Sequence, residues 1–160
     1  MNQYEVKAGL AEVDEFDVVG LSIVTNNTKA AEDINALWER FFKESTGQYV
    51  PDKVNDNIYA VYSDYEGDHE APYRFTIGYR VTGGGGDGTP QSMHRITVQD
   101  QQYVIMSAAG QQPKALIETW EAIWSGDLPR SFTTDFELYG PRFFEDGINE
   151  VLVHIGIKNQ

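Results

Sequence analysis

Apolar residues recur at helical spacing in two segments of the chain, residues 30–44 and 113–126. Their three-and-four spacing places them on one face of a helix and leaves the other face polar. Pro113 suits the first turn of the second helix, and Gly126 suits the position just past its end. The apolar positions are Ile34, Leu37, Trp38, Phe41 and Phe42, and then Leu116, Ile117, Trp120, Ile123 and Trp124. The pattern predicts two amphipathic helices.

Alternating or β-branched runs bounded by turn residues surround each of these helices, and such runs are typical of strands. Two runs precede and two follow the first helix, and the same holds for the second. The order strand, strand, helix, strand, strand is therefore written twice. The runs cover residues 4–13, 16–25, 57–65, 73–81, 92–99, 102–109, 133–140 and 149–158.

The two halves align with each other at offsets of 77, 76 and 82 residues, so that only the loop lengths differ. The aligned pairs are Tyr62 with Tyr139, Phe75 with Val151, and Trp38 with Trp120. One helix over a small sheet leaves an apolar face uncovered, so the two halves are expected to pack together. Concave sites at such junctions are favoured places for ligands.

These patterns predict an α+β fold of tandem β-β-α-β-β repeats with pseudo-twofold symmetry, antiparallel sheets, one main helix per repeat and a ligand cleft between the repeats. We expect a single domain over residues 1–160, because a chain of this length suits one domain. Repeat one would span about residues 1–82 and repeat two about residues 91–160. The Gly-rich residues 83–90 would link them.

The charge and composition narrow the classes of partner. Twelve Lys and Arg against 25 Asp and Glu give a net charge of -13, which repels phosphate backbones and attracts cations. We therefore expect no direct binding of nucleic acid. The chain has no cysteine, which excludes disulfides and thiol chemistry. The first residues lack the basic and apolar regions of a signal peptide, and no apolar run is long enough for a membrane-spanning helix. We therefore expect a cytoplasmic protein that does not bind membranes.

Several motifs resemble cofactor or metal sites without fitting them. Gly83, Gly85 and Gly88 match a dinucleotide-binding spacing, but a strand rather than a helix is predicted after them. The acidic run at 64–70 lacks the spacing of a calcium loop, and the three histidines lack that of a zinc site. These histidines are His69, His94 and His154. We expect neither a cofactor nor a metal.

A carboxylate lies in the middle of the predicted strand at 133–140. Glu137 shares one side of the alternating pattern with Asp135 and Tyr139, while Phe136 and Leu138 point to the other side. The pattern alone leaves open whether that side faces water or a cavity. In a cavity the ionised group would be costly and would indicate function.

Aromatic residues at helical spacing are first of all core residues, but Trp120 would lie near the pseudo-twofold axis. There it would be partly exposed to the cleft, where an indole ring attracts cations. His154 alternates with Val151 and Val153 in the last predicted strand, on the side of Leu152. From this pattern alone His154 is an exposed or hydrogen-bonded structural residue.

The segment TTDFELYGPRFFED, followed by NEVLVHIGIK, resembles the closing segment of effector-binding domains of the gyrase-inhibitory-protein-like superfamily. These domains lie at the C-termini of AraC-type and multidrug-responsive transcription regulators and also occur as free-standing proteins. The resemblance covers essentially the whole chain. It is strongest to the free-standing effector-binding proteins of integron gene cassettes, because the repeat starts near Met1 and no helix-turn-helix segment accompanies it.

The resemblance implies a pocket between the repeats for amphipathic or cationic drug-like molecules. A buried Glu in an F-E-x-Y strand is the counter-charge in this family, and Glu137 matches it. Family members often have Tyr in the last strand where this chain has His154. We therefore predict a non-enzymatic effector-binding protein with Glu137 as its charge, and a raised pKa for Glu137, which we expect to have no partner. The expected aromatic wall comprises Trp120, Tyr62, Tyr139 and His154.

Two alternatives from other functional classes remain open. A desolvated Glu137 beside a Tyr also suits a general base acting on water, as in a hydrolase that opens strained electrophilic rings. Some family members are similar to such enzymes. The protein could instead be an interaction module that acts on gyrase or on another protein partner. The sequence does not identify the natural ligand, a protein partner or the oligomeric state.

Overall fold

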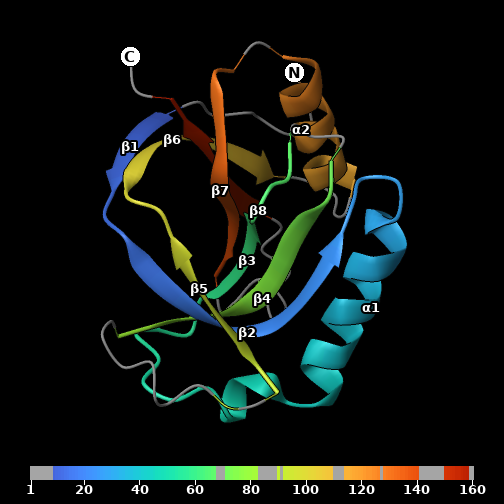
Figure 1. The fold of residues 1–160 in the computed structure, drawn as a ribbon, viewed down its shortest axis with the longest axis vertical. Helices are drawn as coiled ribbons and strands as arrows, with labels where there is room; N and C mark the ends of the chain where they lie inside the picture. The colour runs from blue at the N-terminus through green and yellow to red at the C-terminus, as the bar shows by residue number, and fades with distance from the viewer. Residues whose placement is uncertain are drawn as a thin grey trace.

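The computed structural model of the protein describes residues 9–67, 71–82, 90, 92–109, 114–126, 128–140 and 150–158. Two helices and eight strands are found in this part of the chain, in the order that the sequence predicts (Figure 1). The glycines of the predicted linker, Gly83 to Gly88, lie outside the described residues. The elements are β1 (Gly9–Val13), β2 (Phe16–Thr25), α1 (Ala30–Lys43), η1 (Thr46–Gln48), β3 (Ile58–Ser63), β4 (Tyr73–Val81), β5 (His94–Val98), β6 (Gln101–Ala109), α2 (Lys114–Ser125), β7 (Arg130–Tyr139) and β8 (Glu150–Ile157).

All eight strands belong to one antiparallel sheet with the order β1-β6-β8-β7-β3-β4-β2-β5. If each strand is exchanged for its counterpart in the other repeat, so that β1 becomes β5 and β2 becomes β6, this order is exactly reversed. The pseudo-twofold axis therefore passes between the central strands β3 and β7. Each edge strand joins the opposite repeat, since β1 pairs with β6 and β5 pairs with β2.

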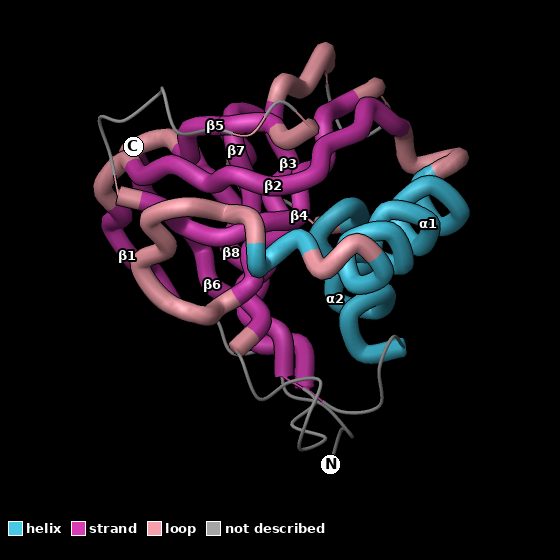
Figure 2. The backbone as a smooth tube through the Cα atoms, turned by 90° about the horizontal axis from the view of Figure 1, so that it is seen from below, coloured by secondary structure: helices cyan, strands magenta, loops and turns pink. Residues whose placement is uncertain are grey.

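Both helices cover the same face of the sheet, as Figure 2 shows. The helix α1 packs on β2 and β4, and α2 packs on β6. The predicted apolar stripes supply the contact, because Leu37 and Phe41 of α1 and Ile123 of α2 join the main core on this face. The fold is thus the predicted α+β arrangement, with one main helix for each repeat.

The opposite face of the sheet has a core of its own that contains no helical residue. Ile96 and Val98 from the edge strand β5 cluster there with Phe136 from β7 and Tyr103 from β6. Strands so far apart in the sheet order can meet only if the sheet curls. The sheet therefore places its central strands between two apolar cores, so that side chains of β3 and β7 are buried on both faces.

Gly20 and Gly78 pair directly across β2 and β4. A Cβ atom on Gly20 would lie 1.9 Å from the carbonyl oxygen of Ile77, and one on Gly78 would lie 2.1 Å from that of Val19. Only glycine allows the two backbones to approach in this way. This close approach lies within repeat one, between two inner strands of the sheet.

Strand β7 begins at Arg130, three residues before the predicted start, and its pairing with β8 is irregular between Arg130 and Asp135. Phe132, within this irregular part, has a left-handed φ of 54°. An irregularity of this kind breaks the period-two alternation, so the sequence pattern could not reveal this part of the strand. None of the described helices is long and apolar enough to cross a membrane.

Candidate functional site

Glu137 lies at the centre of β7, where it pairs with Ala60 of β3 on one side and with Val153 of β8 on the other. Its side chain points to the face that carries the helices, and it is only 2% exposed. The question that the sequence left open is thereby answered, because the side of β7 with Asp135, Glu137 and Tyr139 is buried. Position and burial mark Glu137 as the centre of the candidate site.

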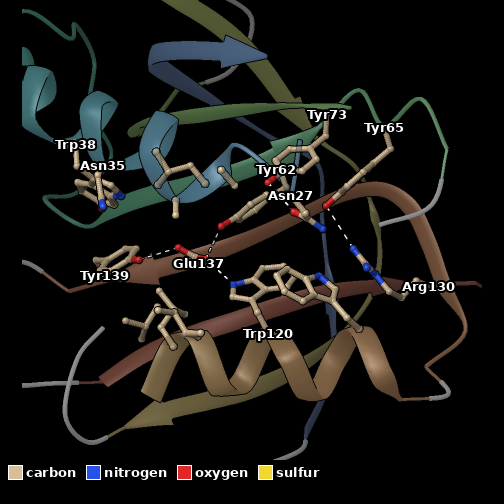
Figure 3. A pocket seen from close by; sticks show the side chains of 17 residues that line it. Asn27, Asn35, Trp38, Tyr62, Tyr65, Tyr73, Trp120, Arg130, Glu137 and Tyr139 are labelled. Carbon is tan, nitrogen blue, oxygen red and sulfur yellow. Dashed lines mark hydrogen bonds between the residues drawn. The ribbon is translucent and has the colours of Figure 1, made fainter. Parts of the chain in front are cut away.

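Three neutral groups donate hydrogen bonds to the carboxylate of Glu137 (Figure 3). The Tyr62 hydroxyl and the Trp120 indole N–H each donate to Oε2 at 2.7 Å, and the Tyr139 hydroxyl donates to Oε1 at 2.7 Å. The expectation that Glu137 has no partner is therefore wrong. Tyr62 and Tyr139 come from the two central strands, whose register brings both hydroxyls to the same carboxylate.

Burial raises the pKa of Glu137, although the hydrogen bonds from Tyr139, Tyr62 and Trp120 act in the opposite direction. The direction agrees with the prediction from the sequence. Burial and the nearby carboxylate also raise the pKa of Tyr62 and of Tyr139 well above its ordinary value. Burial, chiefly, raises the pKa of Tyr73 to about 12. These phenols therefore stay protonated and act as donors.

A cavity of about 490 Å³ opens above Glu137, between α1 and α2 and the central strands. Its walls are mostly apolar and aromatic, as in many ligand pockets. The rings of Tyr62 and Trp120 lie 4.9 Å apart, and Trp38 meets Tyr139 edge-on at 5.1 Å. The cavity thus lies across the two repeats, where the sequence predicts a cleft.

Four of the five predicted site residues, Glu137, Trp120, Tyr62 and Tyr139, line this one cavity. Trp120 is less exposed than the sequence predicts, because the residue is only 7% exposed. Its repeat counterpart Trp38 is the less buried of the two. Hydrogen bonding explains the difference, because the indole N–H of Trp120 is directed inward to Glu137.

The fifth predicted site residue, His154, does not belong to the wall. It pairs with Phe136, so its side chain lies on the face of the sheet opposite Glu137. There it stacks on the ring of Phe136 at 4.2 Å, and burial lowers its pKa. The physical reason is the register of β7 and β8, which aligns Glu137 with Val153 and turns the next residue away.

Two tyrosines of the cavity, Tyr65 and Tyr73, were not predicted from the sequence. The Tyr73 hydroxyl donates to Asn27 Oδ1 at 3.0 Å, which joins β4 to the loop before α1. The alternation of β4 could have indicated Tyr73, since it lies on the same face as Phe75. Tyr65 follows the end of β3, where no periodic signal exists.

A buried ion pair, also missed, lies beside the cavity. The Arg130 Nη2 group donates to Asp135 Oδ2 at 2.7 Å, with side-chain exposures of 6% and 0%. Asp135 also accepts hydrogen bonds from the Tyr65 hydroxyl and, at 2.7 Å, from the Gly156 N–H. Burial raises the pKa of Asp135, while Arg130 acts to lower it. This ion pair joins the two ends of the irregular part of β7.

Within the described residues, no three His, Asp or Glu side chains gather in a group that could hold a metal ion. The acidic run after β3 is described in part. Asp64 in this run forms an ion pair at 3.1 Å with Arg74 of β4. Its described portion therefore behaves as a charged surface turn.

The family model described as integron-associated effector binding protein matches residues 9–155. The protein YobU of Bacillus subtilis (strain 168), provisionally named a transcriptional regulator protein, is 28% identical over 160 residues. That alignment covers 94% of this chain and 99% of YobU.

Solved structures with the same fold include an integron cassette protein from the mobile metagenome of Vibrio cholerae. It is 22% identical and has a TM-score of 0.73, over 96% of this chain and 98% of its own. The protein SAV2435, solved with bound tetraphenylphosphonium, is 17% identical and has a TM-score of 0.76, over 96% of this chain and 94% of its own. At these identities the likeness shows a common fold.

The family match includes every described strand and helix at least in part, and with it both repeats and Glu137. The resemblance that the closing segment suggested is confirmed, and with it the coarse function of binding a small-molecule effector. The chain belongs to the family of integron-associated effector binding proteins.

Proposed function

We propose that this protein binds hydrophobic organic cations in the cavity between α1 and α2. Glu137 is the counter-charge for the ligand, and the rings of Trp120, Tyr62 and Tyr139 form the wall around it. Stacking and cation-π attraction act together with the charge. The negative surface raises the local concentration of cations before they enter.

The observation that carries this proposal is the carboxylate of Glu137. It is 2% exposed, and among the described residues no Lys, Arg or His forms an ion pair with it. A buried carboxylate held only by neutral donors is costly, and a cation that enters the cavity would remove much of that cost. The residue therefore suits a site that is completed by its ligand.

The size and chemistry of the cavity agree with this class of ligand. About 490 Å³ lies in the range of pockets for drug-sized molecules. Tetraphenylphosphonium, the cation in the SAV2435 structure, combines one delocalised positive charge with a large apolar surface. The aromatic wall around Glu137 offers the matching surface, which supports the same kind of ligand here.

The proposal is tested by titrating tetraphenylphosphonium and neutral triphenylphosphine oxide into the wild type and Glu137→Gln in a calorimeter. We expect the substitution to weaken the cation by about tenfold or more, which is about 1.4 kcal/mol, and the oxide by less than about threefold. Glu12→Gln, on the exposed edge strand β1, removes the same charge far from the cavity and should change neither affinity. Equal losses for both ligands with Glu137→Gln would contradict the proposal.

The two alternatives give different outcomes in related experiments. Turnover of a strained epoxide such as styrene oxide, abolished by Glu137→Gln, would instead support the hydrolase. Binding to gyrase that is independent of any small ligand would support the interaction module. The three donors on Glu137 favour ligand binding, because they act against burial and stabilise the ionised form that a bound cation would meet.

A further inference from the structure

The guanidinium of Arg130 is buried at one end of the same cavity. Arg130 lines the cavity together with Glu137, and Figure 3 shows it beside the hydroxyl of Tyr65, at the end away from Tyr139. The ring of Phe132 packs on the guanidinium with 4.3 Å between the Cζ atom and the ring centroid. The cavity therefore holds two separate charged groups of opposite sign.

Arg130 has more donors than the described residues satisfy. Its Nη2 group donates to Asp135 and lies 3.5 Å from the Tyr65 hydroxyl oxygen. The Nε and Nη1 groups are buried, and neither has a hydrogen-bond acceptor among the described residues. Buried donors in native proteins almost always have a partner. Arg130 is 6% exposed and lines the cavity, so the cavity offers a ligand acceptor an approach to the guanidinium.

The local charges indicate which kind of acceptor fits. Arg130 and Asp135 neutralise each other at 2.7 Å, and a bound monocation neutralises Glu137. A ligand carboxylate would add one uncompensated negative charge to a buried region, at a large cost. A carbonyl oxygen would accept from a charged donor without adding net charge.

We propose that the cavity has a second polar subsite at Arg130, which binds a neutral carbonyl-type oxygen carried by the cationic ligand. This inference rests on the proposed function and narrows its ligand class to organic monocations with an ester, amide or ketone at the far end. Asp135, which holds Arg130, and Glu137 lie two residues apart on one face of β7, which is roughly 7 Å along the strand. Asp135 and Tyr65 are positioning residues that hold the guanidinium in place.

The test compares three triphenylphosphonium ligands of similar length by calorimetric titration. Heptyltriphenylphosphonium has no acceptor, (4-methoxycarbonylbutyl)triphenylphosphonium has an ester, and (4-carboxybutyl)triphenylphosphonium has a carboxylate. We expect the wild type to bind the ester about tenfold more tightly than the heptyl ligand and more tightly than the carboxylate. Replacing a single member of a buried pair destabilises proteins. The matched variant is therefore Arg130→Met combined with Asp135→Asn, which keeps the site neutral and should bind the ester and heptyl ligands equally.

Each outcome decides the inference. Equal binding of the ester and heptyl ligands to the wild type, a measurement that needs no variant, would overturn it and leave Arg130 hydrated or purely structural. An ester preference that survives in the double variant would also overturn it, and tightest binding of the carboxylate would overturn the choice of a neutral acceptor. If the wild type binds none of the three ligands, the proposed function itself has failed, which is a distinguishable result.

Discussion

Ala60 of repeat one and Glu137 of repeat two face each other across the central pair of strands, β3 and β7. They are also counterparts in the duplication, since their offset of 77 residues is the one that relates Tyr62 to Tyr139. Both tyrosines donate a hydrogen bond to Glu137. The hydroxyl donors around the centre of the cavity are therefore symmetric, whereas the charge between them belongs to one repeat.

The same asymmetry extends along β7 and β8. The described residues with buried Arg, Asp, Glu or His side chains all belong to repeat two. They are Arg130, Asp135, Glu137 and His154. At the same strand offsets repeat one has Ile58 for Asp135 and Gly78 for His154. Duplication thus supplies the cavity and its tyrosine donors, while charged residues in a single repeat give the cavity its chemistry.

The largest effect that this comparison predicts is on stability. Arg130→Met leaves Asp135 buried without its cationic partner, so we expect a loss of about 3–5 kcal/mol in the free energy of unfolding. Lys53, at the same offset in repeat one, is 31% exposed and lies 3.9 Å from Asp56, so Lys53→Met should cost less than about 1 kcal/mol. Urea unfolding of both variants measures the difference. Similar losses would mean that the buried pair contributes no more than a surface charge.

The second prediction moves the charge from one repeat to the other. In the double variant Ala60→Glu with Glu137→Ala, the new carboxylate enters the space that Glu137 vacates, and Tyr62 and Tyr139 exchange their roles as donors. We expect this variant to bind tetraphenylphosphonium about tenfold more tightly than Glu137→Ala alone, because the counter-charge is restored. Calorimetric titration measures both affinities, and circular dichroism confirms that both variants are folded. No recovery would show that Trp120, which has no exact equivalent in Trp38, is essential to the site.

The third prediction tests the symmetry of the donors. Tyr62→Phe and Tyr139→Phe each remove one hydrogen bond to Glu137, so each should lower the free energy of unfolding by about 1 kcal/mol. Tyr49→Phe, at a tyrosine that is 64% exposed, is the control and should have almost no effect. Urea unfolding at neutral pH measures all three. A clear difference between Tyr62→Phe and Tyr139→Phe would show that the two hydroxyls are not equivalent.

The sequence predicted the repeats and most of the cavity because those features follow from local periodicity. The duplicated pattern identified both helices and all eight strands, and alternation placed Asp135, Glu137 and Tyr139 on one face. Which strands pair, and in which register, is set by contacts between distant residues and does not appear in the pattern. Alternation placed His154 and Val153 on opposite faces of the last strand. Only the register shows that Val153, and not His154, lies beside Glu137.

Arg130 shows a second limit of the sequence analysis. It precedes the regular part of β7 and reaches Asp135 because the strand is irregular between them. Phe132 takes a left-handed conformation there, which no residue type in that segment signals. A basic residue just outside the predicted end of a strand is normally exposed to solvent. The pattern therefore gave no reason to place Arg130 in the cavity.

The smallest predicted effect is a release of protons when a cation binds. Burial raises the pKa of Glu137 above its ordinary value of 4.5, so part of the empty protein carries a proton there at pH values near the raised pKa. A bound cation attracts the carboxylate and lowers that pKa again. Binding must then release less than one proton per ligand, and the release must vanish as the pH rises well above the raised pKa.

The sign of this linkage also fixes how stability depends on pH. A group whose pKa is raised in the folded protein stabilises it fully below about pH 4.5, and this contribution is lost as pH rises through the folded pKa. Titrating tetraphenylphosphonium in buffers with different ionisation enthalpies measures the protons released. Glu137→Gln cannot titrate at this position, so it should release no protons. The free energy of unfolding of this variant should increase relative to that of the wild type as the pH rises. Proton uptake on binding, or an equal release from Glu137→Gln, would mean that Glu137 is not the group that meets the cation.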